Sequence, residues 1–228
     1  MPLEFAIFDL DNTLYPHDAG LLTEIGRRIQ LWLSEHMGLT EKAAQQMRRD
    51  YFRRYGTTLG GLVAEHDTDV HAYLTFVHDI PVETYLRPNP ALATMLASLP
   101  LRRAIYTNAT VEYSQRVLRT LEVTEYFEHI IGIEQVDLRN KPYHDAYERA
   151  LTLLGARGPA CLMVEDSARN LVPAKTLGMT TILVQGNDAT GVADDDADDA
   201  SKASVDFVVD DVLQVGPLVK RLYRDLAR

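Results

Sequence analysis

The sequence predicts an α/β fold: a doubly wound, Rossmann-like parallel sheet core with an all-helical cap domain inserted after the first strand. Six short apolar runs rich in Val, Ile and Phe recur along the chain, and helical patterns separate the later ones. The runs are continuous rather than alternating in hydrophobicity, as in strands buried on both faces of a parallel sheet. Residues 18–86 break this rhythm, because they contain no strand-like run and show helical periodicity instead.

The core is expected to alternate strands and helices along the chain. The runs that predict its strands are Glu4–Leu10, Arg103–Thr107, His129–Ile133, Cys161–Val164, Thr180–Val184 and Asp206–Val209. Helical patterns cover Val111–Leu121, Tyr143–Leu154 and Leu213–Leu226, and the last of these is expected to pack on the core. Such alternation predicts parallel strands joined by helical crossovers, so we assign residues 1–17 and 87–228 to the α/β core.

The inserted segment is expected to form the helical cap. Its first helix is indicated by apolar residues at helical spacing: Leu22, Ile25, Ile29 and Leu33. Thr40 is the expected N-cap of a second helix, Glu41–Tyr55, which Gly56 ends. A third helix is predicted at Val70–His78, and Gly60–Gly61 is interpreted as a turn or a flexible elbow. An insertion at this point suggests a lid that excludes water and selects substrate.

The composition is that of a globular protein, with 46% hydrophobic and 25% charged residues. A net charge of −10 argues against nonspecific binding to nucleic acid, which requires a basic surface. No apolar stretch is long enough to cross a membrane, so no membrane partner is expected. The aspartate-rich run Asp194–Asp199 is assigned to a surface loop. The sequence gives no indication of the oligomeric state.

The N-terminal residues and the single cysteine bear on the compartment. No basic segment precedes the first apolar strand, which argues against a signal peptide. Cys161 has no second cysteine to pair with and lies in the apolar run ACLMV, so it is expected to be a buried thiol in a reducing compartment. We therefore expect a cytoplasmic protein.

Polar side chains follow four of the predicted strands. They are Asp9 and Asp11 after the first strand, Thr107 and Asn108 after the second, Lys141 after the third, and Glu165 and Asp166 after the fourth. In open parallel sheets ligands bind at the carboxyl ends of the strands. These residues, far apart in sequence, are therefore expected to converge on one crevice.

The carboxylates among them suggest phosphoryl transfer. Asp9 and Asp11 lie on the same side of an extended chain, so one can attack phosphorus while the other handles the proton of the leaving group. Asp9, Asp11 and Asp166 cannot stay ionised together without a cation. A hard, oxygen-preferring Mg²⁺ fits that need and would stabilise the charge of the transition state.

The remaining residues suit a phosphate group. The Thr107 hydroxyl and the Asn108 backbone N–H lie at a strand-to-helix turn and can bind phosphate oxygens. Lys141 supplies positive charge. The expected partner is therefore a small-molecule phosphomonoester.

Each of these features alone has a simpler explanation. A lone D-x-D pair is usually two surface carboxylates near a turn, and a lone Lys141 is usually solvated. An EF-hand starting at Asp9 is excluded, because Leu14 replaces the required glycine at position six and Gly20 the required glutamate at position twelve. The catalytic interpretation depends on the convergence of all the features.

The chain resembles the haloacid dehalogenase superfamily of phosphohydrolases over nearly its whole length. Four motifs carry the resemblance: Asp9-x-Asp11-x-Thr13, Thr107, Lys141-Pro142 and Glu165-Asp166. The helical insertion is similar to the cap that the superfamily carries between its first two motifs. Dehalogenating members lack an aspartate at the position of Asp11, so the resemblance implies phosphoester rather than carbon–halogen chemistry.

The resemblance also implies roles for individual residues. It implies that Asp9 is the nucleophile, that Asp11 is the general acid/base, and that Lys141 orients the nucleophile and the phosphate. Thr107 would bind phosphate. The implied Mg²⁺ ligands are Asp9, the Asp11 carbonyl and Asp166, with Glu165 close by.

A narrower resemblance is to the pyrimidine 5′-nucleotidase branch, whose members dephosphorylate small nucleoside monophosphates such as UMP and CMP. It is carried by DLDNTLYP, YGTTLGGL at Tyr55–Leu62, FVHD at Phe76–Asp79, LRPNP at Leu86–Pro90 and YTNA at Tyr106–Ala109. It implies substrate contacts from the cap residues Thr57, Thr58 and His78. Tyr113 and Ser114 depart from the His-Ala pair of that branch, and Glu165 replaces a more usual aspartate.

Other functions remain open at this point. The alternatives are a phosphatase of another small metabolite such as a sugar phosphate, a phosphomutase and, least favoured, a non-catalytic phosphate-binding protein. A second metal site at His66, His71 and His78 is a minor alternative to a polar helix face, since their spacing does not place them on one side of a helix.

Overall fold

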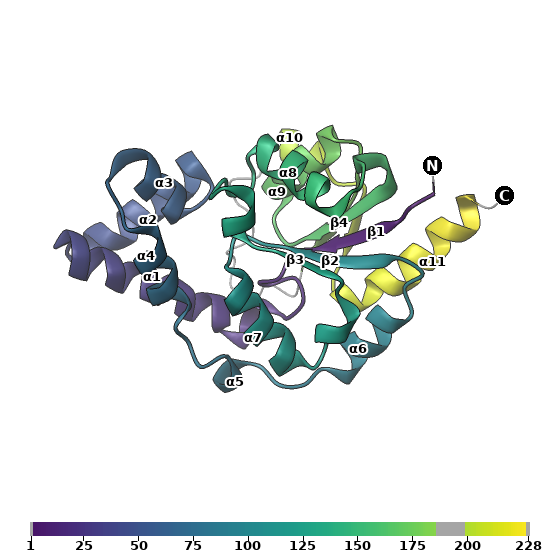
Figure 1. The fold of residues 1–228 in the computed structure, drawn as a ribbon, viewed down its shortest axis with the longest axis horizontal. Coiled ribbons are helices and arrows are strands. Elements are labelled where there is room, and N and C mark those ends of the chain that lie inside the picture. The colour runs from purple at the N-terminus through teal and green to yellow at the C-terminus, as the bar shows by residue number, and fades with distance from the viewer. Residues whose placement is uncertain (1, 186–198, 227–228) are drawn as a thin grey trace.

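A computed structural model describes residues 2–185 and 199–226 of the chain. Six parallel strands form one sheet in the order β3-β2-β1-β4-β5-β6 (Figure 1). They are β1 (Phe5–Phe8), β2 (Arg102–Tyr106), β3 (His129–Ile131), β4 (Cys161–Glu165), β5 (Thr180–Val184) and β6 (Phe207–Val209). Every predicted strand is present, which confirms the fold class. The predicted loop at Asp194–Asp199 lies outside the described residues except for Asp199, which begins α10.

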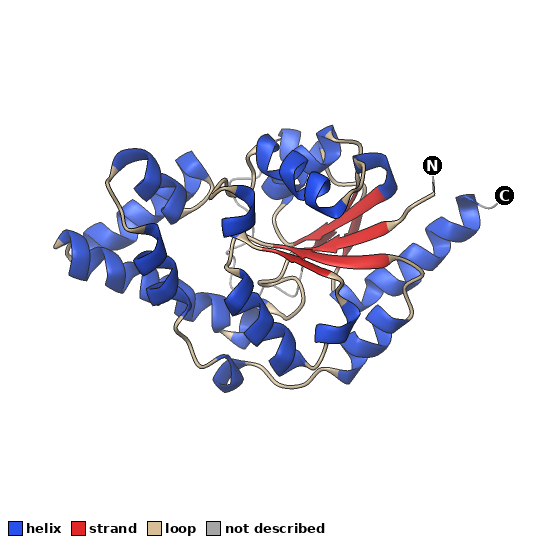
Figure 2. Cartoon of the chain, in the orientation of Figure 1, coloured by secondary structure: helices blue, strands red, loops and turns tan. Residues whose placement is uncertain are grey.

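Helices cover both faces of the sheet and also lie beyond the carboxyl ends of its strands (Figure 2). The α-helices are α1 (Leu21–Met37), α2 (Glu41–Tyr55), α3 (Thr58–Glu65), α4 (Val70–His78), α5 (Val82–Tyr85), α6 (Pro90–Ala97), α7 (Val111–Leu121), α8 (His144–Leu154), α9 (Ala168–Thr176), α10 (Asp199–Ala203) and α11 (Val215–Leu226). Short 3-10 segments are η1 (His17–Ala19), η2 (Thr124–Tyr126), η3 (Ile133–Val136), η4 (Gly158–Ala160) and η5 (Val212–Gln214).

The central strand β1 explains why the apolar runs are continuous. Phe5 and Ile7 belong to the apolar cluster under α8 and α9, whereas Ala6 and Phe8 belong to the cluster under α6, α7 and α11. All four side chains are buried, so both faces of the strand require apolar residues. The same burial encloses the free thiol of Cys161 and raises its pKa to about 12.

The predicted C-terminal helix packs on this core. It is divided into η5 and α11, and α11 buries Val215, Leu218 and Val219 in the cluster it shares with α6 and α7. The expectation that this helix is a core element is confirmed. Among the helices of residues 2–185 and 199–226, none combines the length and apolarity that crossing a membrane requires.

Helices α1 to α4 form the cap beyond the strand ends (Figure 1). As predicted, the Thr40 hydroxyl caps α2 by accepting a hydrogen bond from Ala43 N at 3.3 Å, and Gly56 ends the helix in a left-handed conformation with φ 84°. The observed bounds of α2 and α4 equal the predicted ones. Trp32 of α1 packs edge-on against Tyr73 and Phe76 of α4, so aromatic contacts fix the cap interior.

The Gly60–Gly61 pair is neither a turn nor an elbow, because both residues lie within α3. The Thr57 side chain starts this helix by accepting a hydrogen bond from Gly60 N at 2.9 Å. A Cβ on Gly61 would lie 2.2 Å from Cγ of Tyr51 in α2, and one on Gly60 would lie 2.7 Å from Oδ1 of Asn140 in the core. The glycines therefore allow close helix packing rather than bending.

We predict that Gly61→Ala lowers the free energy of unfolding by about 1–3 kcal/mol, because the added methyl group overlaps the Tyr51 ring. Alanine is the better helix former by about 1 kcal/mol, so an unobstructed site would give the opposite sign. Urea denaturation checks this, with Val63→Ala, at an exposed position of the same helix, as the control. An unchanged or higher stability of Gly61→Ala would contradict the close packing.

Candidate active site

The predicted site residues converge at the carboxyl ends of β1, β2 and β4. In the sheet β1 lies between the other two, and Phe8 pairs with Ile105 on one side and Val164 on the other. Asp9 therefore follows the central strand, and its backbone N–H donates to Val164 O at 2.9 Å. The group of residues predicted from the strand ends is thus centred on Asp9.

Lys141 lies at the middle of this group with only 1% of its surface exposed. Its Nζ donates to Asp9 Oδ1 at 2.6 Å and to Glu165 Oε1 at 2.7 Å. Burial alone would lower the pKa of the Lys141 ammonium, but the two carboxylates raise it above its ordinary value. Lys141 is thus a buried, permanently charged link between two strand ends.

The side chain of Asn108 fixes the backbone of Lys141, a role that the sequence did not suggest. Its Oδ1 accepts from Lys141 N at 2.7 Å, and its Nδ2 donates to Lys141 O at 3.4 Å. Asn140 also donates to Lys141 O, and in addition to the cap carbonyl of Tyr55 at 2.9 Å. The lysine is therefore held at its backbone as well as at its ammonium group.

Glu165 is completely buried, and both of its carboxylate oxygens accept hydrogen bonds. Besides Lys141, Asn170 Nδ2 donates to Oε1 at 2.7 Å, and Ser167 N donates to Oε2 at 2.7 Å. Burial raises the pKa of the Glu165 carboxyl, but the Lys141 charge and these donors outweigh it and hold the pKa below its usual value. Glu165 is therefore an ionised, fully bonded carboxylate.

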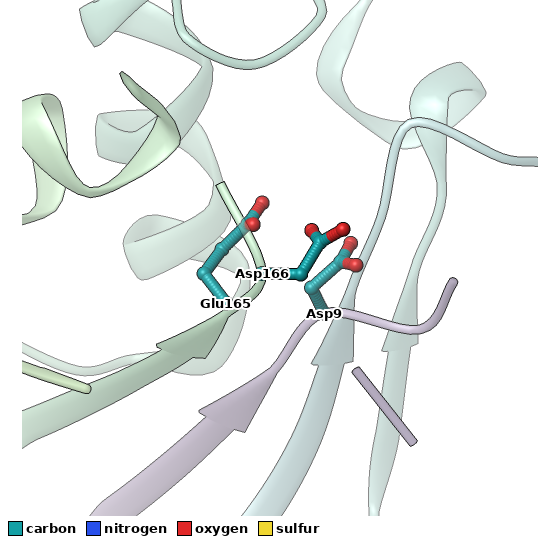
Figure 3. A group of neighbouring side chains, drawn as sticks. All are labelled: Asp9, Glu165 and Asp166. Atoms are coloured by element: carbon teal, nitrogen blue, oxygen red, sulfur yellow. The ribbon is translucent and has the colours of Figure 1, made fainter. Parts of the chain in front are cut away.

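Three carboxylates form a group suited to a metal ion. Asp9, Glu165 and Asp166 each place one oxygen within 4.8 Å of the others, and the three side chains converge (Figure 3). Burial, with the nearby charge of Glu165, raises the pKa of Asp9 to about 7 and that of Asp166 well above its usual value. The group is short of positive charge although Lys141 is present. A hard divalent cation such as Mg²⁺ fits such oxygen donors.

The alternative metal site in the cap does not form. His78 bonds to Leu74 O through Nδ1 at 3.0 Å, and His66 bonds to the Tyr51 hydroxyl through Nε2 at 2.8 Å. Over residues 2–185 and 199–226, Asp9, Glu165 and Asp166 are the only group of metal-binding side chains close enough together.

Asp11 is held by two tyrosines. The hydroxyls of Tyr15 and Tyr113 both donate to its Oδ1, the latter at 2.9 Å. Burial raises the pKa of the Asp11 carboxyl, and the two hydrogen bonds oppose that rise. Sequence reasoning did not anticipate these contacts, although it singled out Tyr113 as a departure from a family pattern.

Two threonines complete the floor of the site. Thr107 is buried at the end of β2, and its hydroxyl accepts from Ala109 N at 3.1 Å. The Thr13 hydroxyl donates to Asp9 Oδ2 at 3.4 Å. The structure therefore brings the predicted core residues together at the carboxyl ends of the strands.

The three predicted cap residues lie at two separate contacts between the cap and the core. Thr57 and buried Thr58 start α3 beside Gly56, where a Cβ would lie 2.7 Å from Lys141 O. His78 is 7% exposed, and its ring stacks on Tyr113 of α7 with 4.7 Å between ring centroids. The first contact adjoins the lysine, and the second adjoins the tyrosine that bonds Asp11.

The sheet is parallel and doubly wound, and carboxylates and a buried lysine meet at the carboxyl ends of its strands. Residues 4–178 match the family of haloacid dehalogenase-like hydrolases. The chain belongs to this family.

Particular relatives span most of the chain. It is 24% identical over 236 residues to glyceraldehyde 3-phosphate phosphatase of Methanocaldococcus jannaschii, covering 96% of this chain and 98% of that protein. It is 24% identical to phosphate metabolism protein 8 of Saccharomyces cerevisiae, covering 77% of this chain but only 60% of the yeast protein. The structure of L-2-haloacid dehalogenase from Xanthobacter autotrophicus matches with a TM-score of 0.58 and 22% identity over 96% of this chain and 98% of that one.

We predict that His78 makes stability depend on pH. Burial, with the nearby charge of Arg116, lowers its pKa from 6.5 to about 4 in the folded chain. Between these values the unfolded chain binds a proton that the folded chain does not, so stability falls as pH drops through this window. The loss is on the order of 3 kcal/mol.

Denaturant unfolding at pH 7 and pH 4.5 of the wild type and of His78→Gln measures this contribution. The comparison between variants cancels the carboxylates that titrate in the same range. We expect His78→Gln to lose less stability on acidification than the wild type. Equal losses in the two proteins would contradict the buried, neutral histidine.

Proposed function

We propose that the chain is a Mg²⁺-dependent phosphomonoester hydrolase that forms an aspartyl-phosphate on Asp9. The observation that carries the proposal is the arrangement around this carboxylate. Lys141 bonds to it, Asp166 lies within metal-sharing distance, and Asp11 is held two residues away by groups of its own. These are the parts needed for attack, charge stabilisation and proton transfer.

In the first step Asp9 attacks phosphorus. An oxygen of its carboxylate forms a bond to phosphorus as the bond to the ester oxygen breaks. The ester oxygen keeps the bonding electron pair and takes a proton from Asp11. Lys141 orients the Asp9 carboxylate, and Thr107 and the Asn108 backbone N–H bind the phosphate oxygens.

In the second step water hydrolyses the aspartyl-phosphate. Asp11, now ionised, takes a proton from the water as its oxygen bonds to phosphorus. The bond between phosphorus and the Asp9 oxygen breaks, which regenerates the carboxylate and releases inorganic phosphate. Asp11 thus ends the cycle protonated, as it began.

Asp9, Asp166 and the backbone carbonyl of Asp11 would hold the Mg²⁺. When bound, the ion neutralises the phosphate charge that the carboxylates would otherwise repel. Glu165 is not assigned as a direct ligand, because both of its oxygens already accept hydrogen bonds from the protein. Its role is to hold Lys141 and the start of α9.

Asp11 favours phosphoester over carbon–halogen cleavage. A halide leaves as a stable anion and needs no proton, whereas an alkoxide leaving group does. A carboxyl group held by two hydroxyls beside the nucleophile can supply the leaving-group proton that only the first reaction needs. This supports a phosphatase even though the fold is shared with a dehalogenase.

For the substrate we propose a small nucleoside monophosphate such as UMP or CMP. Support comes from the resemblance of the Tyr55–Leu62 cap segment to pyrimidine 5′-nucleotidases and from its position against the Lys141 loop. A sugar phosphate is the second candidate, favoured by the likeness to a glyceraldehyde 3-phosphate phosphatase. A phosphomutase would instead return the phosphoryl group to the sugar.

We predict that purified protein releases phosphate from p-nitrophenyl phosphate only with Mg²⁺ present, and that Asp9→Asn abolishes this activity. The amide cannot form the acyl-phosphate, although it keeps the shape of the side chain. Asp50→Asn, at a cap position away from the site, is the matched control and should retain wild-type rates. Activity in excess chelator, or in Asp9→Asn, would exclude the mechanism.

We also predict that UMP and CMP give higher kcat/KM than hexose or triose phosphates. Phosphate release across a panel of nucleoside and sugar monophosphates measures the ranking. A preference for sugar phosphates would exclude the nucleotidase assignment and leave the phosphatase intact. Isomerisation of a hexose 1-phosphate with little phosphate release would indicate a mutase.

A further inference from the structure

We propose that Tyr15 and Tyr113 are positioning residues that hold Asp11 as the proton donor to the leaving group. The proposal rests on the proposed phosphatase function and assigns to it two residues outside the four motifs of the superfamily resemblance. Tyr113 was singled out in the sequence only because it replaces an expected histidine. The structure gives it a partner in the active site.

Both phenol hydroxyls donate to the same oxygen of Asp11. With Oδ1 accepting from Tyr15 and Tyr113, Oδ2 is the oxygen left to carry the transferable proton. Two donors on one oxygen also fix the rotation of the carboxyl group. The pair therefore selects which oxygen is protonated and where it points, which is what transfer to a leaving group requires.

Both tyrosines are buried and remain donors. Tyr15 is 3% exposed and Tyr113 is completely buried. Both rings are enclosed by protein, so their hydroxyls donate to the Asp11 carboxyl group rather than to solvent.

The ring of Tyr113 is itself fixed by the segment that returns from the cap. His78, the last residue of α4, stacks on it at an interplanar angle of 30°. Arg116, on the next turn of α7, donates to His78 O at 2.5 Å and to Ile80 O at 2.8 Å. His78 thus helps to hold Asp11 indirectly, by packing against Tyr113. This role is an alternative to the direct substrate contact expected from the sequence.

The proposal makes the hydroxyls matter in proportion to the basicity of the leaving group. Nitrophenolate leaves readily without a proton, whereas an alkoxide needs one in the transition state. A tyrosine that only fills space would affect all substrates equally. The value of kcat/KM reports the steps up to the first bond cleavage, so it isolates this proton transfer from the later attack of water.

The test measures kcat/KM of Tyr15→Phe, Tyr113→Phe and the double variant on p-nitrophenyl phosphate, phenyl phosphate and an alkyl phosphate such as UMP. Phenylalanine keeps the buried rings and removes only the hydroxyls. For each single variant we expect a loss of about tenfold with the alkyl ester and less than about threefold with p-nitrophenyl phosphate. The double variant should lose about a hundredfold with the alkyl ester.

Tyr223→Phe is the matched control. Its hydroxyl donates to Leu3 O at the opposite end of the sheet, so its removal should leave all three rates unchanged. Thermal denaturation confirms that each variant is folded, and the two single variants provide independent tests. Equal losses on all substrates, or none, would overturn the positioning role. A wild-type protein without Mg²⁺-dependent activity would instead overturn the proposed function.

Discussion

The ion pairs of the buried Lys141 ammonium group are the interactions on which the rest of the site depends. A buried charge is costly unless it is paired and hydrogen-bonded, and Lys141 meets that condition only when β1 and β4 present Asp9 and Glu165 side by side. The sheet register supplies this, because Phe8 and Val164 are paired neighbours. The fold therefore places the lysine between these two carboxylates, and removing Lys141 would leave both buried without a cation.

The cap contacts the core next to the active site at more than one point. Arg169 of α9 donates to Phe52 O and Arg53 O at the end of α2, each at 2.9 Å. Next to it, Asn140 joins Tyr55 O to the backbone of Lys141. The stack of His78 on Tyr113 is a separate connection, made through the returning segment. The cap is thus linked by hydrogen bonds to the backbone of Lys141, and by ring stacking to the tyrosine that bonds Asp11.

The sequence predicted the six strands and the cap helices α1, α2 and α4, because two-sided burial and helix capping leave strong local patterns. It missed α3, where two glycines suggest a turn and only the ring of Tyr51 explains them. It placed the motif residues at one sheet edge. It did not find the bonds of Asn108 or Tyr113, because these join residues far apart in the chain and depend on side-chain direction.

The small residues at the corner between α2 and α3 set a condition for exchanging caps among relatives. A side chain at Gly56 or Gly60 would collide with Asn140, whose amide links the cap to the lysine backbone. A transplanted cap with larger residues there would have to sit farther from the core and would lose that link. Substrate range can therefore be redesigned in this scaffold only with replacement caps that keep glycine at these two positions.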